Sequence, residues 1–279
     1  MANILLVANL NCDRILNLDK PLQMGGRFHY QDGGKRLGGG GANTGIGLVW
    51  AKHTVTLVSQ VGKDKLGDWL LAEASTQGID CHLIQRYEKN TCEMLLVMTP
   101  DGERTIIRPE RPVFELAKPP VWGQWDAVYF NSSAKGCESW ANSALNHCLV
   151  LAQLAKDDRS RPCDILIASM TDIQGRSQLP PWEYGLTIAG DSLKYFIITD
   201  GVDGSYLYTH DGCKHVDSTL AKVVETTGAG DAYAAGLLHG LTSGLGIIES
   251  MTEAGVWASF AVATQSSIPG EALKHYLYG

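Results

Sequence analysis

The sequence predicts an α/β fold: a three-layer α/β/α sandwich with a mostly parallel central sheet and a small β-strand lid. Short apolar runs typical of buried strands recur between helix-like stretches, namely ILLVANL, HTVTLVSQVG, DAVYF, DILIAS and KYFIITDG. This alternation is typical of βαβ units, which place their strands in parallel. Of the 279 residues, 44% are hydrophobic, which is enough for a sizeable core. We expect one domain over residues 1–279.

The first element, within MANILLVANL, is expected to be a strand rather than a signal sequence, because it has no charged leading region and no cleavage pattern. No apolar run approaches the length of a membrane span. The seven cysteines are odd in number and never spaced as Cys-x-x-Cys, which argues against a disulfide framework and a structural zinc site. These features predict a cytoplasmic protein with reduced thiols and no membrane partner.

The charge pattern favours a small-molecule partner. The formal net charge is −7, and the chain has no long basic run. Nucleic acids and anionic membranes require a basic surface, so neither is expected as a partner.

Two segments alternate residue by residue and are expected to form the lid. They cover about residues 24–37 and 91–108, and the second contains the hairpin signal Pro100-Asp101-Gly102. A small antiparallel sheet of this kind is expected over the carboxyl ends of the parallel strands, where ligands bind in open sheets. Farther along the chain, ALNHCLVLAQLAK is expected to be helical.

A first glycine cluster lies in LGGGGANTGIGLVWAKH, from Leu37 to His53. Its glycines allow a ligand to approach the backbone, and Asn43 can either cap the following helix or bind a hydroxyl-rich molecule. A plain tight turn is the alternative. The cluster does not match Gly-x-Gly-x-x-Gly, and the chain contains no Walker A pattern, so a dinucleotide fingerprint and a P-loop are both excluded.

A second cluster, ETTGAGDAYAAGLLHGL, places Gly228, Ala229 and Gly230 directly before Asp231 and a helix-like pattern. Free N–H groups in the first turn of a helix, together with its dipole, form a site for a phosphate or a developing anion. An acidic side chain at this position would repel a phosphate. Its presence is explained if it takes a proton from a hydroxyl that attacks phosphorus. Simple N-capping is the alternative role for Asp231.

The order of these motifs resembles the ribokinase-like carbohydrate kinase family, also called the phosphofructokinase-B family. The resemblance is carried by Asn11-x-Asp13 after the first strand, GGGGAN, VSQVGKDKLGDWLLAEASTQGID, TDGVDGSYL and ETTGAGDAYAAGLLHGL. It covers residues 4–110 and 195–270 well and the middle poorly. In this family, lids often serve as dimer surfaces, so the resemblance also implies a possible homodimer through the lid.

The resemblance implies roles at the reacting centre. Asp231 matches the catalytic base, and Gly228, Ala229 and Gly230 match a backbone anion hole for the transferring phosphoryl group. The acceptor would be bound by residues near the first strand and the first glycine cluster, which are Asn11, Asp13, Gly39 and Asn43.

The nucleotide would lie over a turn formed by Thr199, Asp200, Gly201 and Gly204, with the helix over residues 247–264 beside the adenine. A simple strand-to-helix turn is the alternative interpretation of that segment. The implied cofactors are ATP and Mg²⁺, together with K⁺ if the monovalent-cation site of many relatives is retained at Glu225 and Thr227.

Three departures from the family pattern stand out. Glu225 replaces the usual leading aspartate, so dependence on a monovalent cation is an open question. Gly40 stands where ribokinases proper often carry a lysine. The stretch 164–195 is expected to be too short for the family's strand with its Asn-x-x-Glu motif, which helps to organise magnesium and phosphate.

The resulting expectation is ATP-dependent phosphorylation of a primary hydroxyl of a sugar or sugar-like substrate. Two alternatives are a nucleoside kinase of the same fold and a sugar- or nucleotide-binding regulator with weak or no turnover. The intact Gly-Ala-Gly-Asp motif argues against the regulator.

Overall fold

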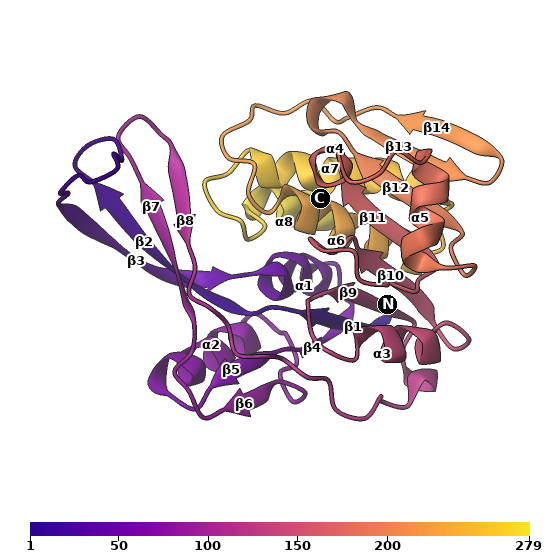
Figure 1. Ribbon diagram of the computed structural model, residues 1–279, viewed down its shortest axis with the longest axis horizontal. Helices are drawn as coiled ribbons and strands as arrows, with labels where there is room; N and C mark the ends of the chain where they lie inside the picture. Colours follow the sequence, from indigo (N-terminus) through magenta and orange to yellow (C-terminus); the bar gives the residue numbers. More distant parts are fainter.

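The computed structural model describes all 279 residues and has an eight-stranded sheet at its centre (Figure 1). The strand order is β14-β13-β12-β11-β10-β9-β1-β4, and every neighbouring pair is parallel except those that involve β13 and β14 at one edge. The strands are β1 (Asn3–Ala8), β4 (Thr54–Val58), β9 (Ala127–Asn131), β10 (Leu149–Gln153), β11 (Ile165–Ser169), β12 (Tyr195–Thr199), β13 (Ser205–Thr209) and β14 (Gly212–Val216).

Helices cover both faces of this sheet, as the alternation of strands and helices predicts. Ile4 and Leu6 of β1 pack into one core cluster, whereas Leu5 and Val7 pack into a second cluster on the other face. The first face carries α1 (Gly40–Trp50), α2 (Lys65–Thr76), α6 (Ala229–Thr242), α7 (Ile247–Val262) and α8 (Glu271–Tyr278), and the second carries α3 (Cys137–Ala144) and α5 (Pro181–Ala189). The three-layer α/β/α architecture is therefore confirmed.

A second sheet of four strands projects from the main body (Figure 1). Its order is β3-β2-β7-β8, with β2 (Asn11–Leu18), β3 (Tyr30–Gly38), β7 (Glu93–Met98) and β8 (Arg104–Ile107). Both segments predicted for the lid lie in this sheet and outside the central one. The prediction missed β2, which separates them, and β2 pairs with β7 in parallel, so the lid is not wholly antiparallel.

The smaller elements are a two-stranded parallel pair, β5 (Gln60–Gly62) and β6 (Gln85–Tyr87), the four-residue helix α4 (Met170–Ile173), and 3₁₀ turns at Trp122–Gln124 and Gly201–Asp203. None of the helices combines the length and the apolar composition that a bilayer span requires. All seven cysteines are free thiols, as their spacing predicted.

Two predictions for the middle of the chain are wrong. The stretch ALNHCLVLAQLAK is not a helix, because its centre forms the buried strand β10 between β9 and β11. A short apolar run does not distinguish a buried strand from a helix by periodicity alone. The stretch 164–195 was expected to be too short for the family's strand that carries the Asn-x-x-Glu motif, but it has room for the parallel strand β11 and for α5, and only the motif itself is absent.

Candidate active site

The centre of the site is Asp231, in the first turn of α6. Two amide side chains hold its carboxylate: Asn43 Nδ2 donates to Oδ2 at 2.8 Å, and Asn131 Nδ2 donates to Oδ1 at 2.9 Å. Asn43 lies on α1 and Asn131 is the last residue of β9, so three separate elements meet at one carboxylate. Simple helix capping does not account for this arrangement, because Gly228 is the N-cap residue of α6.

The ionisation of Asp231 reflects two opposing effects. Desolvation by the surrounding protein raises the pKa of the carboxyl group, and the hydrogen bonds from Asn43 and Asn131 only partly offset that effect. A carboxylate with a raised pKa is a stronger proton acceptor than an exposed aspartate. The two amides fix its orientation without supplying a positive charge.

Three consecutive glycines connect Asp231 to the predicted acceptor residues. A methyl group at Gly38 would clash with the Asp13 carboxylate, one at Gly39 would lie 3.0 Å from Asn11 Nδ2, and one at Gly40 would lie 3.2 Å from Asp231 Oδ1. Two Cα–Cα steps span at most about 7 Å, so Asp13 and Asp231 lie at the two ends of Gly38–Gly40, a glycine strip about as long as a monosaccharide. The predicted residues Asn11, Asp13, Gly39, Asn43 and Asp231 are therefore brought together.

Asp13 is 8% exposed, and no hydrogen bond from the chain reaches its carboxylate. Burial raises the pKa of Asp13. A mostly buried carboxylate is normally satisfied by donors, and the hydroxyls of a polyhydroxylated ligand are donors of this kind.

Asn131 was missed by the sequence reasoning. The available signal was its position as the polar residue that ends the apolar run DAVYF, at the carboxyl edge of the sheet. Gly40 leaves room for it, because a methyl group there would lie 2.6 Å from Asn131 Nδ2. A lysine at Gly40 would therefore displace this amide from Asp231.

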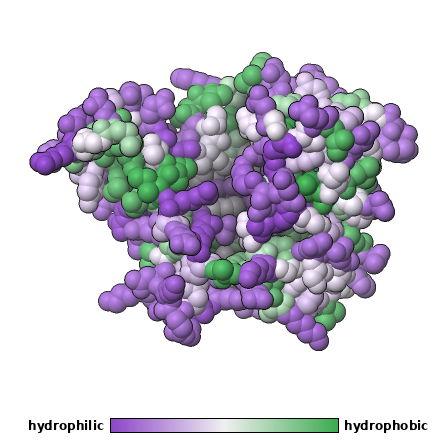
Figure 2. All heavy atoms as spheres, viewed as in Figure 1, coloured by the Kyte–Doolittle hydropathy of each residue, from purple (hydrophilic) through white to green (hydrophobic).

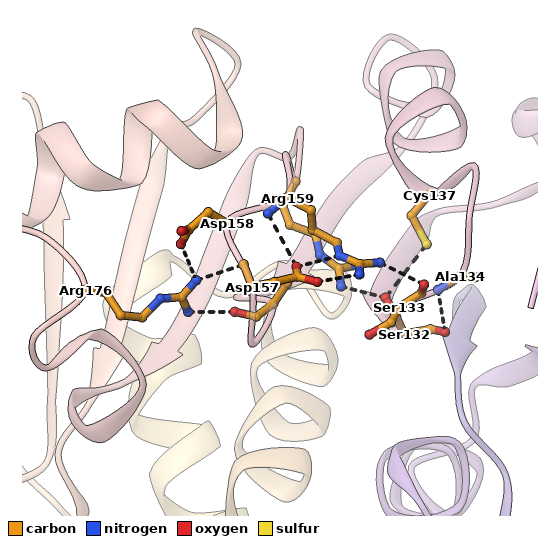
Figure 3. Close-up of polar contacts among 10 residues, drawn as sticks. Ser132, Ser133, Ala134, Cys137, Asp157, Asp158, Arg159 and Arg176 are labelled. Atoms are coloured by element: carbon orange, nitrogen blue, oxygen red, sulfur yellow. Dashed lines mark hydrogen bonds and ion pairs between the residues drawn. The ribbon is translucent and has the colours of Figure 1, made fainter. Parts of the chain in front are cut away.

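Arginines hold the segment that follows Asn131 in place. Arg161 Nη2 donates to the Ser132 carbonyl at 2.6 Å, and Arg159 Nη1 donates to the Ser133 carbonyl at 2.8 Å. Arg159 is itself held by the Asp157 carboxylate, as Figure 3 shows. These contacts fix the end of β9 and thus position Asn131.

The turn at the start of α6 contains the three residues that the resemblance matches to an anion hole, and the N–H of one of them, Ala229, donates to the Thr226 carbonyl at 3.2 Å. Gly228 has φ 82°, a left-handed conformation that favours glycine, and a side chain there would approach the Ser267 carbonyl to 2.7 Å. Gly230 has open space in front of it and no positive φ. The left-handed conformation of this turn therefore belongs to Gly228 and not to Gly230.

A cavity of about 280 Å³ opens beside this turn. It is lined by the 3₁₀ turn after β12, by the start of α6 and by one face of α7, including Thr199, Gly201, Gly204, Ala229, Gly230, Met251, Gly255 and Ala258. Three of the four predicted nucleotide residues line it. Asp200 does not, and its backbone N–H instead closes the turn onto the Gly204 carbonyl at 2.8 Å. Figure 2 shows the surface hollowed between the lid and the main body.

Glu225 is engaged by the protein itself. Its Oε1 atom accepts hydrogen bonds from the Thr227 N–H at 3.2 Å and from Thr227 Oγ1 at 2.8 Å, and it lies 2.7 Å from Arg104 Nη1 of the lid. A guanidinium group thus lies where a monovalent cation would approach this carboxylate. The residues Glu225 and Thr227 do not fit a K⁺ site in this arrangement.

The Asn-x-x-Glu motif is absent, but β11 ends at Ser169, and Asp172 of α4 follows it at the same spacing. Ser169 Oγ accepts a hydrogen bond from the Asp172 N–H at 3.2 Å, and Asp172 pairs with Lys156. Burial opposes ionisation of Asp172, but hydrogen bonds from Lys156 and Ser169 prevail and lower its pKa. Ser169 is the register partner of Thr199, which places this carboxylate one strand away from the cavity.

Comparison with known proteins gives a consistent result. The family model described as pfkB family carbohydrate kinase matches residues 1–159 and 183–272. A ribokinase of Staphylococcus aureus is 22% identical over 255 residues, covering 82% of this chain and 83% of the relative. A 5-dehydro-2-deoxygluconokinase of Clostridium beijerinckii is 23% identical over 292 residues, covering 90% and 84%.

A solved structure shares the fold. The ribokinase of Arabidopsis thaliana, complexed with ribose and ATP, aligns with a TM-score of 0.79 at 19% identity, covering 99% of this chain and 98% of that one. Because the family model spans both the lid strands and the segment from α5 to α8, the chain belongs to the pfkB family of carbohydrate kinases and is a phosphotransferase.

Proposed function

We propose that this sugar or nucleoside kinase transfers the γ-phosphoryl group of ATP to a primary hydroxyl of a sugar, with Asp231 as the general base. The observation that carries the proposal is the pair of hydrogen bonds from Asn43 and Asn131, which orient the Asp231 carboxylate beside the glycine turn of α6. The Arabidopsis relative was solved with ribose and ATP, which supports this pair of substrates.

In the proposed step, Asp231 takes the proton of the acceptor hydroxyl as its oxygen attacks the γ-phosphorus. The bond from that phosphorus to the β–γ bridging oxygen breaks, and ADP leaves. The positive end of α6 and the backbone N–H groups of Gly228 and Gly230 would stabilise the charge that develops on the phosphoryl oxygens, whereas the Ala229 N–H already donates to the Thr226 carbonyl at 3.2 Å.

The nucleotide would occupy the cavity between the turn at Gly201–Asp203 and α7, with its phosphates directed toward Gly230. Mg²⁺ usually binds through one or two carboxylates together with substrate phosphates, and it neutralises phosphate charge. Asp172, which pairs with Lys156 just beyond the end of β11, is a candidate carboxylate for such an ion.

The acceptor would lie along the glycine strip, with Asp13 binding its hydroxyls at the end remote from Asp231. Charge-assisted hydrogen bonds from two hydroxyls to one carboxylate would fix the sugar so that a terminal hydroxyl reaches the base. One relative is named a ribokinase and another a 5-dehydro-2-deoxygluconokinase, so family membership leaves the acceptor open.

The test is an ATP-dependent phosphorylation assay with the full chain, Mg²⁺ and a panel of pentoses, hexoses, their acids and nucleosides. Formation of ADP together with a phosphomonoester on a CH₂–O group, seen by ³¹P–¹H coupling, is expected with a sugar. Transfer to nucleosides alone would indicate a nucleoside kinase. ATP binding without transfer to any acceptor would indicate a regulator and contradict the proposal.

A further inference from the structure

Three arginines surround Asp13 at the end of the strip remote from Asp231. They are Arg36 of β3, Arg104 of β8 and Arg111, which follows β8, and the charges of all three act on the Asp13 carboxylate. Arg36 is the register partner of Asp13 in the lid sheet, so both side chains leave the sheet on the same face.

Two of these arginines have no carboxylate partner. Arg111 Nη2 donates to Asn11 Oδ1 at 2.9 Å and contacts Met94 Sδ at 3.8 Å. Arg36 Nη1 donates to the Gln265 carbonyl at 3.1 Å. Neither forms an ion pair, whereas Arg104 is paired with Glu225.

This arrangement is costly unless a ligand completes it. Desolvation lowers the pKa of Arg111, which shows that its charge is held in a poorly solvated place. The Nε atoms of Arg36 and Arg104 are buried without a hydrogen-bond partner, and Arg104 Nη1 lies within ion-pair distance of Glu225 without forming a well-aligned hydrogen bond. Buried charges and donors in proteins are normally paired, so free guanidinium donors around a ligand site indicate an anionic partner.

The charges of the neighbouring side chains also favour an anionic partner. Three arginines face two carboxylates, Asp13 and Glu225, so this end of the site carries one net positive charge. The third carboxylate, Asp231, lies at the other end of the strip, where the phosphoryl group arrives. A guanidinium fork matches a carboxylate or a phosphate in shape and charge.

We propose that the acceptor is an anionic sugar, whose carboxylate or phosphate is held by Arg36, Arg104 and Arg111 while its hydroxyls bind Asp13. The inference rests on the proposed function, because it assigns the acceptor of that same site. The anionic group lies at the lid end, and the hydroxyl that accepts the phosphoryl group lies at the Asp231 end.

The first experiment measures kcat/KM with ATP for matched acceptors that all keep a free primary hydroxyl: five- and six-carbon aldonates and 2-keto-aldonates, fructose 6-phosphate, and the corresponding neutral sugars. An anionic acceptor is expected to exceed its neutral counterpart by about 10–100-fold, the factor that corresponds to a charge-assisted hydrogen bond. Preference for aldonates would identify a carboxylate, and preference for fructose 6-phosphate would identify a phosphate. A neutral sugar or nucleoside that exceeds every anion would overturn the inference but leave the kinase function intact.

The second experiment separates binding from turnover. D-gluconate, fructose 6-phosphate and their neutral counterparts are titrated calorimetrically with a non-hydrolysable ATP analogue present. Tighter binding of an anion, weakened by salt, supports the inference even if no acceptor is phosphorylated, which would count only against the proposed function. Equal or tighter binding of the neutral compounds overturns the inference.

Arginine variants test the site itself. Arg111→Met and Arg36→Met should raise KM for the preferred anion about 10–100-fold and change that of its neutral counterpart much less. Lys35→Met is the matched control, because Lys35 directly precedes Arg36 in β3 and carries the same charge. Its Nζ lies 4.2 Å from the centre of the Trp69 ring, away from Asp13. If Arg111→Met fails to fold, Arg111→Lys retains the charge without the fork. KM values unchanged in the arginine variants would contradict the proposal.

Discussion

Replacement of Arg104 by methionine tests how the lid is joined to the catalytic turn. In the structure, Arg104 Nη1 lies 2.7 Å from Glu225 Oε1, and the two side chains are only 19% and 15% exposed. The same oxygen accepts two hydrogen bonds from Thr227, which precedes the glycine turn of α6. Loss of Arg104 therefore leaves a mostly buried carboxylate without its cation.

The magnitude follows from the geometry. At 2.7 Å and an effective dielectric constant of about 20, the Coulomb attraction is about 6 kcal/mol, from which the desolvation of both ions must be subtracted. Breaking a fully buried pair by removing one partner costs about 3–5 kcal/mol. Because both groups retain some exposure, we expect Arg104→Met to lower the free energy of unfolding by about 2–3 kcal/mol.

The assay is urea unfolding at pH 7, combined with initial rates, for Arg104→Met, Glu225→Gln and the double variant. The coupling free energy of this cycle should be about 1–3 kcal/mol. Arg27→Met is the control, because Arg27 is an exposed lid arginine without an ion pair, and it should change stability by less than about 0.5 kcal/mol. Additive effects within about 0.5 kcal/mol would refute the argument that Arg104 holds Glu225.

Three further predictions concern the Glu225 carboxylate, the glycine strip and the buried His53. Because Arg104 already pairs with Glu225, replacing K⁺ by tetramethylammonium should leave the rate of phosphoryl transfer unchanged. A large loss of rate would show that a monovalent cation binds beside the Glu225 carboxylate. Gly38→Ala should raise KM for the acceptor, because the added methyl group would displace the Asp13 carboxylate, whereas Gly123→Ala, which meets open space, should not. Equal KM values in the two variants would refute the claim that the acceptor binds along the glycine strip. Burial lowers the pKa of His53 from 6.5 to about 4, and the charge of His239 adds to that shift. The neutral His53 side chain therefore contributes fully to stability above pH 6.5, and this contribution is lost as the pH falls toward 4. Urea unfolding should show a loss of about 1–2 kcal/mol between pH 7 and 5 that is absent in His53→Asn, and equal losses in both proteins would contradict it.

The sequence predicted the parts of the fold that depend on local pattern. Alternating apolar runs and helical stretches identified the central sheet, and the glycine turn before Asp231 marked the start of α6. It failed at β10, because LVLAQ is short, apolar and buried, and such runs lack a distinguishing period. It also missed β2, which joins the two predicted lid segments into one sheet.

The site was predicted only where a motif marks it. Asp13, Asn43 and Asp231 belong to recognisable motifs, and the structure brings them to one strip. Asn131 stands outside any motif, and its contact with Asp231 depends on the parallel order of β9 and β1. The approach of Arg104 to Glu225 likewise depends on how the lid is placed, which no local pattern determines.

The measurement that tests the central claim most directly is the rate of phosphoryl transfer by Asp231→Asn. Asparagine is nearly isosteric and retains a side-chain oxygen that can accept a hydrogen bond, but it cannot take the acceptor's proton. We expect kcat to fall by about two to four orders of magnitude, the usual contribution of a positioned general base, while folding and the calorimetric affinity for the ATP analogue remain close to those of the original chain. A variant that folds, binds the nucleotide and retains near-normal kcat would contradict the assignment of Asp231 as the base.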